Sequence, residues 1–302
     1  MNKKRKVVAF MNMKGGVCKT TLCVNIANTL VERYSKKVLL IDMDPQYNAT
    51  QIILGTIYGD SDTKKYDEDC RNSRKTTYDL YKYMNEPPEE PEGENIAHLF
   101  NATYSKKKNY DREFSIQVKD NFDLLPGSIE LIDYQINQKV GVERILDRYI
   151  DGAGLREKYD YILIDSPPTY SFYFISSYLA ADTYIIPLKP DTIAALGLQL
   201  LNKAISSINQ SVDKKIDSMG IVFTLIDPRN GLHSPVVKDF EGDSALKQYI
   251  FKGQIKYYKQ IPDGINNKQF MIDVSEHEIS SAIAIITEEF MGRLEENYER
   301  SE

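Results

Sequence analysis

A phosphate-binding loop is predicted by the stretch Lys14-Gly15-Gly16-Val17-Cys18-Lys19-Thr20-Thr21. It lies between a short apolar run, 7–12, and a segment with helical spacing, 20–33. Where a strand feeds a helix, backbone N–H groups and the helix dipole converge on an anion, so phosphate is the expected ligand. The two glycines would let the backbone approach the phosphate oxygens. Lys19 would reach the β- and γ-phosphates, and the Thr20 hydroxyl would bind Mg²⁺.

The stretch departs from the strict pattern G-x-x-x-x-G-K-[ST] at both glycine positions, where Met13 and Cys18 stand. A glycine-bearing turn that binds nothing is therefore an open alternative for these eight residues taken alone. Cys18 as a nucleophile is disfavoured, because nothing identifies a partner among the three histidines of the chain: His98, His233 and His277.

Two further apolar runs deliver carboxylates. The run 38–42 ends at Asp42 and is followed by Asp44, and the run 161–165 ends at Asp165. Phosphoryl transfer from a nucleotide needs a water in line with the γ-phosphate and metal charge balance around it, and carboxylates beside a phosphate loop can supply both. Solvated strand ends with ordinary capping carboxylates are the alternative for these motifs.

Buried strands are needed to position these groups, and the apolar runs predict them at 7–12, 38–42, 161–165, 183–187 and 220–225. Helical spacing lies between most of these runs. This alternation predicts an α/β fold with a doubly wound, mostly parallel sheet flanked by helices on both faces. The segment 275–297 has apolar residues at helical spacing, which predicts an amphipathic helix lying on the sheet.

One domain covering 1–302, with an insertion at 55–120 after the second strand, is the expected organisation. The insertion is rich in charge, and its Pro/Glu-rich part at 86–94 predicts a mobile loop. Some helix is expected within it, around 77–84.

Composition limits the location and the partners of the protein. Hydrophobic residues make up 42% and charged residues 27%, and no apolar stretch reaches the roughly 18 residues of a membrane span, so we expect a cytoplasmic protein. Three cysteines are too few and too irregular for a disulfide framework or a zinc site, so free thiols are expected at Cys18, Cys23 and Cys70.

The net charge of −6 excludes a protein coated in basic side chains, so any DNA contact must come from a local patch. A lysine-rich stretch with interleaved tyrosines contains the candidate contacts Lys247, Lys252, Lys256, Lys259 and Lys268, with Tyr249, Tyr257 and Tyr258 between them. A solvated helix face with core tyrosines is an equally open interpretation of this stretch. The short clusters 3–6 and 106–108 are more typical of solvated surface.

Taken in order, these motifs resemble the ParA/MinD/nitrogenase-iron-protein superfamily. Lys-Gly-Gly-Val-x-Lys-Thr looks like its deviant phosphate loop, in which the first lysine, here Lys14, is the signature residue. The run from Asp42 to Thr50 looks like its D-x-D-P-Q-x-N-A-T element. Asp165-Ser166-Pro167-Pro168 resembles its Walker B aspartate and switch segment. The resemblance covers Val7–Thr50 and Phe122–Leu294 and leaves the insertion unmatched.

The resemblance implies a P-loop NTPase fold and a Mg-ATP-dependent ATPase, most like the ParA-type (Soj-like) partition ATPases. It implies catalytic roles for Lys14, Lys19 and Asp44, with Lys14 crossing a dimer interface to the partner's ATP and Asp44 orienting the water. It implies magnesium binding by Thr20, Asp42 and Asp165. It implies ATP binding by Lys14, Gly15, Gly16, Val17, Cys18, Lys19, Thr20, Thr21 and Pro262, the last near the adenine. The implied partners are a second copy upon ATP binding, a ParB-like centromere-binding protein and non-specific DNA of the nucleoid.

Other members of the superfamily define the alternatives. A MinD-like positioning ATPase needs a basic amphipathic tail, whereas the C-terminal tail here carries Glu288, Glu289, Glu295, Glu296, Glu299 and Glu302. Anionic lipid should repel such a tail, so no membrane contact is expected. An iron-protein reductase needs paired cysteines for a shared cluster, and no matching pair is visible. A metabolic ligase of the dethiobiotin-synthetase type remains open, although the D-x-D-P-Q-x-N-A-T element favours the partition branch.

Overall fold

A computed structural model describes residues 6–59, 70, 73, 75–85, 112–132, 142–212, 214–227, 229–231, 233–257 and 269–299. These residues build a seven-stranded sheet in the order β3-β4-β2-β5-β1-β6-β7. All neighbouring strands are parallel except β3 and β4, which are antiparallel. The strands are β1 (Val7–Phe10), β2 (Val38–Asp42), β3 (Ile116–Lys119), β4 (Phe122–Leu125), β5 (Tyr161–Asp165), β6 (Thr183–Leu188) and β7 (Asp217–Phe223).

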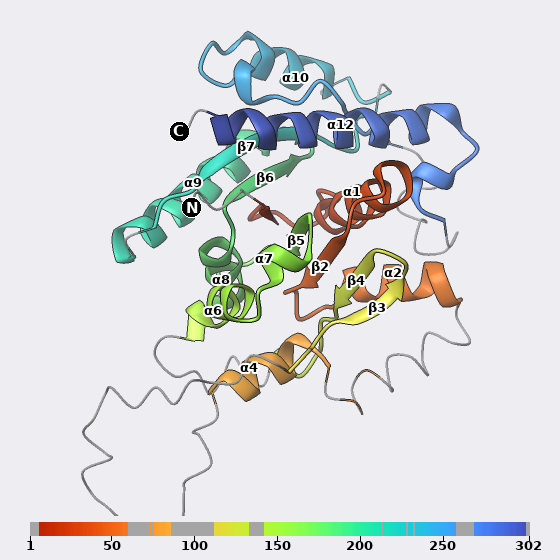
Figure 1. Cartoon of the computed structure of the whole chain (residues 1–302). Helices are drawn as coiled ribbons and strands as arrows, with labels where there is room; N and C mark the ends of the chain where they lie inside the picture. Colours follow the sequence, from red (N-terminus) through yellow and green to blue (C-terminus); the bar gives the residue numbers. More distant parts are fainter. Residues whose placement is uncertain are drawn as a thin grey trace, which may run out of the picture.

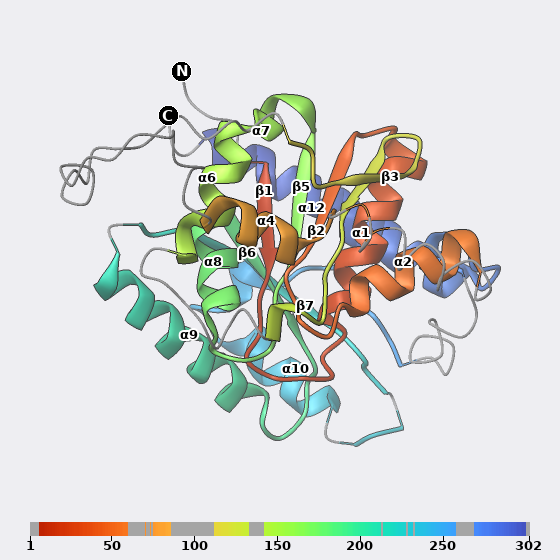
Figure 2. The same ribbon diagram turned by 90° about the horizontal axis from the view of Figure 1, so that it is seen from below.

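Helices cover both faces of the sheet (Figure 1). Viewed at 90° to that orientation, α4, α6 and α8 lie in front of the strands and α12 lies behind them (Figure 2). The helices are α1 (Lys19–Tyr34), α2 (Asn48–Tyr58), α4 (Thr77–Asn85), α6 (Ile145–Gly152), α7 (Leu155–Lys158), α8 (Phe172–Ala180), α9 (Ala194–Ser211), α10 (His233–Gly242) and α12 (His277–Glu299). The predicted doubly wound α/β fold is confirmed.

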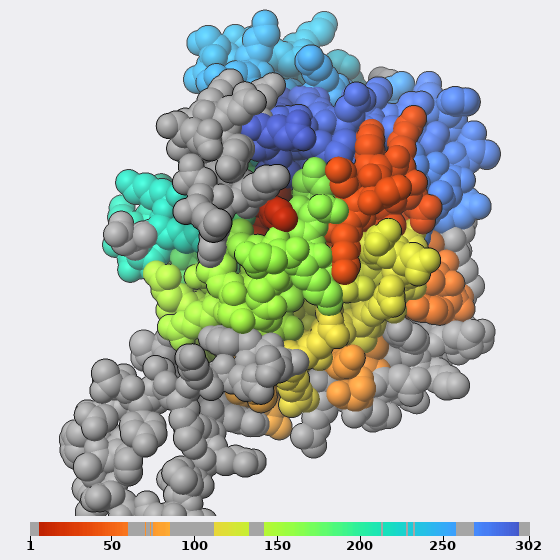
Figure 3. Space-filling model, in the orientation of Figure 1, coloured from red at the N-terminus to blue at the C-terminus, as the bar shows by residue number. Residues whose placement is uncertain are grey.

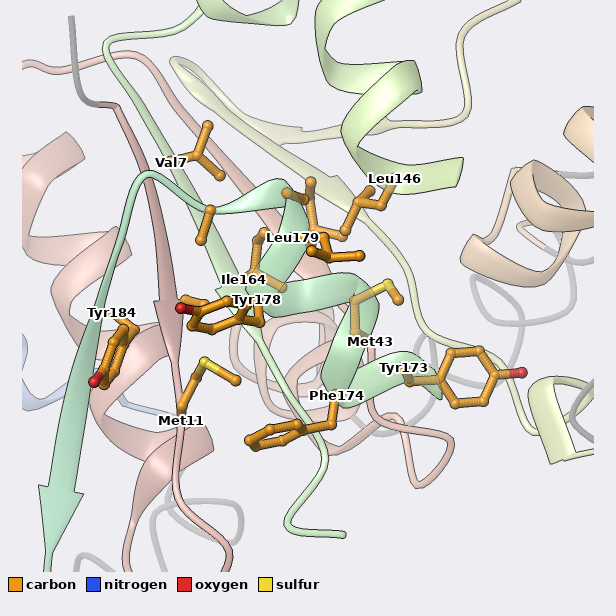
Figure 4. Packing of buried hydrophobic residues seen from close by; sticks show 14 of the residues in the cluster. Val7, Met11, Met43, Leu146, Ile164, Tyr173, Phe174, Tyr178, Leu179 and Tyr184 are labelled. Atoms are coloured by element: carbon orange, nitrogen blue, oxygen red, sulfur yellow. The ribbon is translucent and has the colours of Figure 1, made fainter. Parts of the chain in front are cut away.

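The alternation of side chains along the strands explains the two layers. Val7 and Ala9 of β1 belong to a core with residues of α4, α6, α8 and α9, whereas Val8 and Phe10 belong to a second core with residues of α1, α2 and α12. Successive side chains of a strand point to opposite faces, so a strand that is buried on both faces must be apolar throughout. Figure 4 shows part of the first core, where Val7 of β1, Ile164 of β5 and Tyr184 of β6 lie beside residues of α8.

The five predicted strands are confirmed, β2 and β5 with the predicted bounds and the others with shifted ends, and β7 shows one reason for a shift. It begins at Asp217, whereas the apolar run had predicted a start at Gly220. Gly220 has φ 143° and lies where the register between β6 and β7 shifts. A β-carbon at this position would meet the Tyr249 carbonyl oxygen at 2.2 Å and Arg293 Nη1 at 2.6 Å. The glycine therefore lies inside the strand, at an irregularity where only glycine fits.

Part of the segment 55–120 is built into the core. Helix α4 confirms the helix expected around 77–84. The Tyr81 ring is fully buried and packs edge-on against Phe172 and Tyr173 of α8, with centroid distances of 5.8 Å and 6.0 Å. Strand β3, which the sequence did not predict, extends the sheet at its edge. The Pro/Glu-rich stretch 86–94 and the lysines at 106–108 lie outside the described residues.

The predicted C-terminal amphipathic helix is confirmed as α12. Ile283, Ile286 and Phe290 are fully buried against the sheet layer, and Figure 3 shows α12 in blue lying against α1 in orange-red. Arg293 fastens the helix to its surroundings: its guanidinium donates to the carbonyls of Met219 (2.9 Å) and Ile250 (2.7 Å). None of the described helices is long and apolar enough to cross a membrane.

Candidate functional site

The loop between β1 and α1 presents backbone to solvent at the carboxyl edge of the sheet. Gly15 and Gly16 are exposed, and a β-carbon added to either would have nothing within 4 Å. Gly16 has φ 69°, in the left-handed region that favours glycine. Cys18, the N-cap of α1, makes no capping bond with its side chain. An open backbone at the start of a 16-residue helix suits an anion.

Lys19 and Thr20 converge on Asp165 at the end of β5. Lys19 Nζ lies 3.3 Å from Asp165 Oδ1 and also donates to the Ser166 carbonyl. The Thr20 hydroxyl donates to Asp165 Oδ2 at 2.7 Å. Asp165 is fully buried, and burial raises the pKa of its carboxyl against the lowering effect of Lys19. The loop and the β5 aspartate predicted from sequence are thus brought together.

This cluster fits magnesium by its chemistry. A hydroxyl that donates its proton to a carboxylate keeps oxygen lone pairs for a cation. Magnesium binds through one or two carboxylates and substrate phosphates, with water completing its shell, so Thr20 and Asp165 are a sufficient protein contribution.

Asp42 lies beside Asp165 on the neighbouring strand β2, but its oxygens are engaged within the chain. Oδ2 accepts from the Thr50 amide (2.9 Å) and hydroxyl (2.7 Å), and Oδ1 accepts from the Asp44 amide (3.2 Å). Burial raises the pKa of Asp42 to about 7, with Asp165 adding to the effect and Thr50 opposing it. Support of the magnesium shell by Asp42 stays a prediction.

Thr50 is a site residue whose role the sequence did not reveal. Its hydroxyl donates to Asp42 and accepts from the Gly127 amide at 2.8 Å, so it joins α2 to the turn after β4. A β-carbon at Gly127 would lie 2.8 Å from Tyr47 Cβ and 2.9 Å from Asp42 Cγ. The D-x-D-P-Q-x-N-A-T element is therefore a folded unit, in which the amide and hydroxyl of its last residue, Thr50, donate hydrogen bonds to the carboxylate of its first residue, Asp42.

Asp44 lies in the turn between β2 and α2, where it is 4% exposed. Its Oδ1 accepts from the Gln46 amide at 2.9 Å, and its carbonyl accepts from the Tyr47 amide at 2.8 Å. These bonds fix the turn, and among the described residues no hydrogen bond engages the second carboxylate oxygen. Its expected role in orienting water stays a prediction.

Lys14 is paired with a different carboxylate from Lys19. Its amide donates to Asn12 Oδ1 at 2.9 Å, and its Nζ forms an ion pair with Asp191, in the connection from β6 to α9. The two predicted lysines are therefore held by different carboxylates, Lys19 by Asp165 and Lys14 by Asp191. Asp191 was not among the residues predicted from sequence, because nothing in its local pattern signals a partner 177 residues away.

The Cys18 thiol is unsuited to nucleophilic catalysis. Burial raises its pKa to about 11, although Thr21 and Lys189 oppose the shift. The reactive form of cysteine is the thiolate, and a thiol with such a pKa is protonated at neutral pH. The sequence interpretation of Cys18 as a part of the loop rather than a nucleophile agrees with this environment. Its backbone is strained, with φ 55° and ψ 30°.

The lysine- and tyrosine-bearing segment 247–257 runs beside β7, with isolated bridges from Ile221 to Ile250 and from Ile226 to Lys256. Tyr249 and Tyr257 are 42% and 39% exposed, so these two are surface residues and the interpretation as core tyrosines is wrong for them. Three lysines of this segment are exposed as well: Lys247, Lys252 and Lys256. The other predicted contacts and the predicted adenine contact lie outside the described residues: Tyr258, Lys259, Lys268 and Pro262.

Comparison with known proteins places the chain in a family. The family described as an AAA domain (AAA_31) matches residues 5–218. An uncharacterized protein of Methanocaldococcus jannaschii is 30% identical over 72% of this chain and 72% of its own length. The sporulation initiation inhibitor protein Soj of Bacillus subtilis is 27% identical over 85% of this chain and 83% of its own length.

A solved structure agrees with the fold. The chain is similar to a plasmid partition protein of Borrelia burgdorferi bound to AMPPNP, with 23% identity and a TM-score of 0.69 over 96% of this chain and all of that one. Three observations indicate the same superfamily: the family match over most of the chain, the sequence relatives, and the phosphate loop with its strand-end aspartates. The chain belongs to the ParA/MinD-type superfamily of P-loop ATPases.

Proposed function

We propose that this protein is a Mg-ATP-dependent ATPase that dimerises on ATP binding, binds DNA without sequence preference and segregates a plasmid or chromosome with a ParB-like partner. The observation that carries the proposal is the convergence of Lys19 and Thr20 on buried Asp165 beside the open Gly15–Gly16 backbone. Positioning and charge stabilisation are most of what a protein contributes to phosphoryl transfer, and this arrangement supplies both.

In this proposal the loop from Lys14 to Thr21 holds the triphosphate, and Pro262 lies near the adenine. Thr20 and Asp165 hold magnesium with support from Asp42, and the bound ion neutralises charge on the phosphates. Asp44 orients the attacking water. Support for ATP comes also from the AMPPNP bound by the Borrelia partition protein.

Dimerisation is supported by the apolar rim of the same edge. Large exposed hydrophobic side chains follow the carboxyl ends of β4, β5 and β6, namely Ile129, Ile132, Tyr170, Ile193, Leu196 and Leu200. Leu196 and Leu200 lie on one face of α9, at the spacing of one helical turn. Exposed apolar side chains gathered at one edge are typical of a surface that another protein covers, and a second copy would bring two nucleotide sites together.

DNA binding is supported by the exposed lysines and tyrosines of segment 247–257. The one ion pair that engages a lysine of this segment joins, among the described residues, Lys256 to Glu278 at 3.4 Å, with both side chains mostly exposed. Such a pair is weak and yields readily to phosphate. A dimer presents the segment twice, so the DNA affinity becomes dependent on nucleotide and on salt.

A MinD-like membrane role has less support. The apolar face of α12 is buried in the protein, and the exposed side includes Glu288 and Glu295. A helix that inserts into lipid needs a free apolar face and a basic polar face.

DNA retention on a filter with ATP, with ADP and without nucleotide tests the proposal. Retention that appears only with ATP and falls with salt is the expected result, together with ATP hydrolysis. The double variant Lys252→Glu/Lys256→Glu should lose retention, whereas Lys82→Glu, an exposed lysine of α4 away from the proposed dimer rim, should keep it. Equal DNA retention with ATP, with ADP and without nucleotide would contradict the proposed ATP-dependent DNA binding. Binding to anionic liposomes would instead favour the membrane role.

A further inference from the structure

We propose that Asp191 is a positioning residue that holds Lys14 against its own subunit and thereby opposes the ATP-dependent dimer. The inference rests on the proposed function, in which Lys14 reaches across to the partner's nucleotide. Its structural basis is the ion pair between Lys14 Nζ and Asp191 Oδ2 within one chain.

The backbone of Lys14 is fixed on the side of the loop that faces β6 and α9. The Lys14 amide donates to Asn12 Oδ1 at 2.9 Å, and Asn12 Nδ2 donates to the Pro187 carbonyl at 2.6 Å. The Lys14 β-carbon lies 4.0 Å from the β-carbon position of Gly197 in the first turn of α9. The lysine therefore lies along the beginning of α9 from its backbone to its amine.

Asp191 is fixed independently of the lysine. Its amide donates to the Lys189 carbonyl at 2.9 Å, its carbonyl accepts from the Ala194 amide at 2.9 Å, and its Oδ1 accepts from the Ile193 amide at 3.2 Å. The other carboxylate oxygen, Oδ2, is the one that meets Lys14. Asp191 is thus a fixed anion that is ready to receive the lysine, and the side chain that must move is Lys14.

The two side chains are 22% and 24% exposed, so the pair is shielded from water without being sealed. For Lys14 to contact a second subunit, its amine must leave Asp191. A symmetric dimer contains two copies of the pair, so its formation breaks both. The free energy needed to separate Lys14 from Asp191 therefore weakens the dimer twice, once for each subunit. The strength of the ion pair with Asp191 sets that free energy.

The test uses the full chain and three variants. Asp191→Asn removes the charge and keeps an oxygen for the Ile193 amide, and Asp191→Glu restores the charge. Asp243→Asn is the matched control, because Asp243 Oδ1 also accepts from the amide two residues on, at 2.8 Å, but has no ion pair among the described residues.

The first measurement is the rate of reductive methylation of Lys14 in protein without nucleotide, followed by mass spectrometry. The Asp191→Asn variant should be labelled several-fold faster at Lys14 than the wild type, while Asp191→Glu and Asp243→Asn should resemble the wild type. Equal rates in wild type and Asp191→Asn overturn the inference, because they show that the pair does not hold the amine.

The second measurement is the dimer dissociation constant with AMPPNP, from sedimentation equilibrium. Two pairs of modest strength predict that Asp191→Asn lowers this constant by about 2- to 30-fold, with no effect of the Asp243→Asn control. A wild type that dimerises with AMPPNP and an Asp191→Asn variant with the same constant overturn the inference alone. If neither protein dimerises with AMPPNP while Lys14 labelling still differs, the proposed dimer fails, and the effect of Asp191 on it fails as well.

Discussion

The hydroxyl of Thr20 donates a 2.7 Å hydrogen bond to Asp165 across 145 residues of sequence. It joins the first turn of α1 to the last residue of β5, and Lys19 contacts the same carboxylate from the adjacent position. The phosphate loop and the predicted magnesium ligand are therefore one cross-linked unit, in which a change at one residue alters the environment of the other two.

Lys19→Ala should abolish nucleotide binding and also destabilise the protein. Lys19 is 6% exposed and is the cation that faces buried Asp165, so its removal leaves a buried carboxylate without a counterion. Breaking such a pair costs about 3–5 kcal/mol. Isothermal titration with ATP measures the binding and urea unfolding measures the stability.

Lys203→Ala, at an exposed position on α9, is the control for the Lys19 experiment and should change neither quantity. A Lys19→Ala protein that is folded and binds ATP like the wild type would refute the assignment of the loop.

Asp44→Ala should bind ATP, hydrolyse it slowly and accumulate as a dimer. The substitution removes one hydrogen bond, from the Gln46 amide, so the expected loss of stability is only about 1 kcal/mol. Single-turnover hydrolysis and light scattering check the two effects. Asp44→Asn keeps the acceptor and serves to separate loss of charge from loss of the turn; normal turnover in both variants would remove Asp44 from the reaction.

Cys18→Gly should be about 1 kcal/mol more stable than Cys18→Ala, because both variants lose the thiol packed against the second core while only glycine relieves the left-handed backbone, which costs about 1–2 kcal/mol with a β-carbon and is partly offset by the freedom of glycine in the unfolded chain. Thermal unfolding measures the difference. Cys18→Ala, which keeps the β-carbon, should not be stabilised. Equal stability of the two variants would show that a β-carbon at this position costs nothing.

Gly127→Ala should destabilise the protein by about 1–3 kcal/mol, since the new methyl group would lie 2.8 Å from Tyr47 Cβ and 2.9 Å from Asp42 Cγ. Gly242→Ala is its matched control at the end of α10, where the added methyl meets nothing within 4 Å. Its stability should stay within about 0.5 kcal/mol of the wild type. Equal free energies of unfolding of the two variants in urea would show that the turn after β4 accommodates the added methyl group without loss of stability.

The free energy of unfolding should fall as pH rises between about 4 and 7. Asp42 has a folded pKa raised to about 7, so the folded state holds a proton that the unfolded state releases from about pH 4 upward. Stability from this group is full below the unfolded pKa and is lost as pH rises through the folded one. Asp42→Asn should flatten the slope measured by unfolding without nucleotide or magnesium, and an unchanged slope would mean that Asp42 is ionised throughout.

The central strands and the loop were predictable from sequence because each has a local signal. β1, β2 and β5 are buried on both faces and are therefore continuous apolar runs. Asp42 ends β2 and Asp165 ends β5, and the parallel pairing of these two strands places the two carboxylates side by side. The turn from β1 into α1 is fixed by the glycines and the lysine. The predicted strand start at Gly220 was three residues too late, because a glycine inside a strand has the sequence signal of a strand end; β7 begins at Asp217.

The remaining site residues depend on contacts between distant segments. Thr50 donates a hydrogen bond to Asp42 only because α2 packs next to β2. Asp191 forms an ion pair with Lys14 only because β6 lies beside β1 in the sheet. The exposure of Tyr249 depends on the path of the chain along β7. Strand β3 has four residues with one buried position, which is too weak a pattern to predict.

The guanidinium of Arg293 stacks on the Phe251 ring at 4.2 Å and bonds the carbonyls of Met219 and Ile250, so α12, β7 and the lysine-bearing segment meet in one side chain. These contacts attach the proposed DNA-binding segment to the body of the domain. If the proposed DNA contact at Lys252 holds, a load on it would pass through Arg293 into α12, which packs against α1 of the phosphate loop.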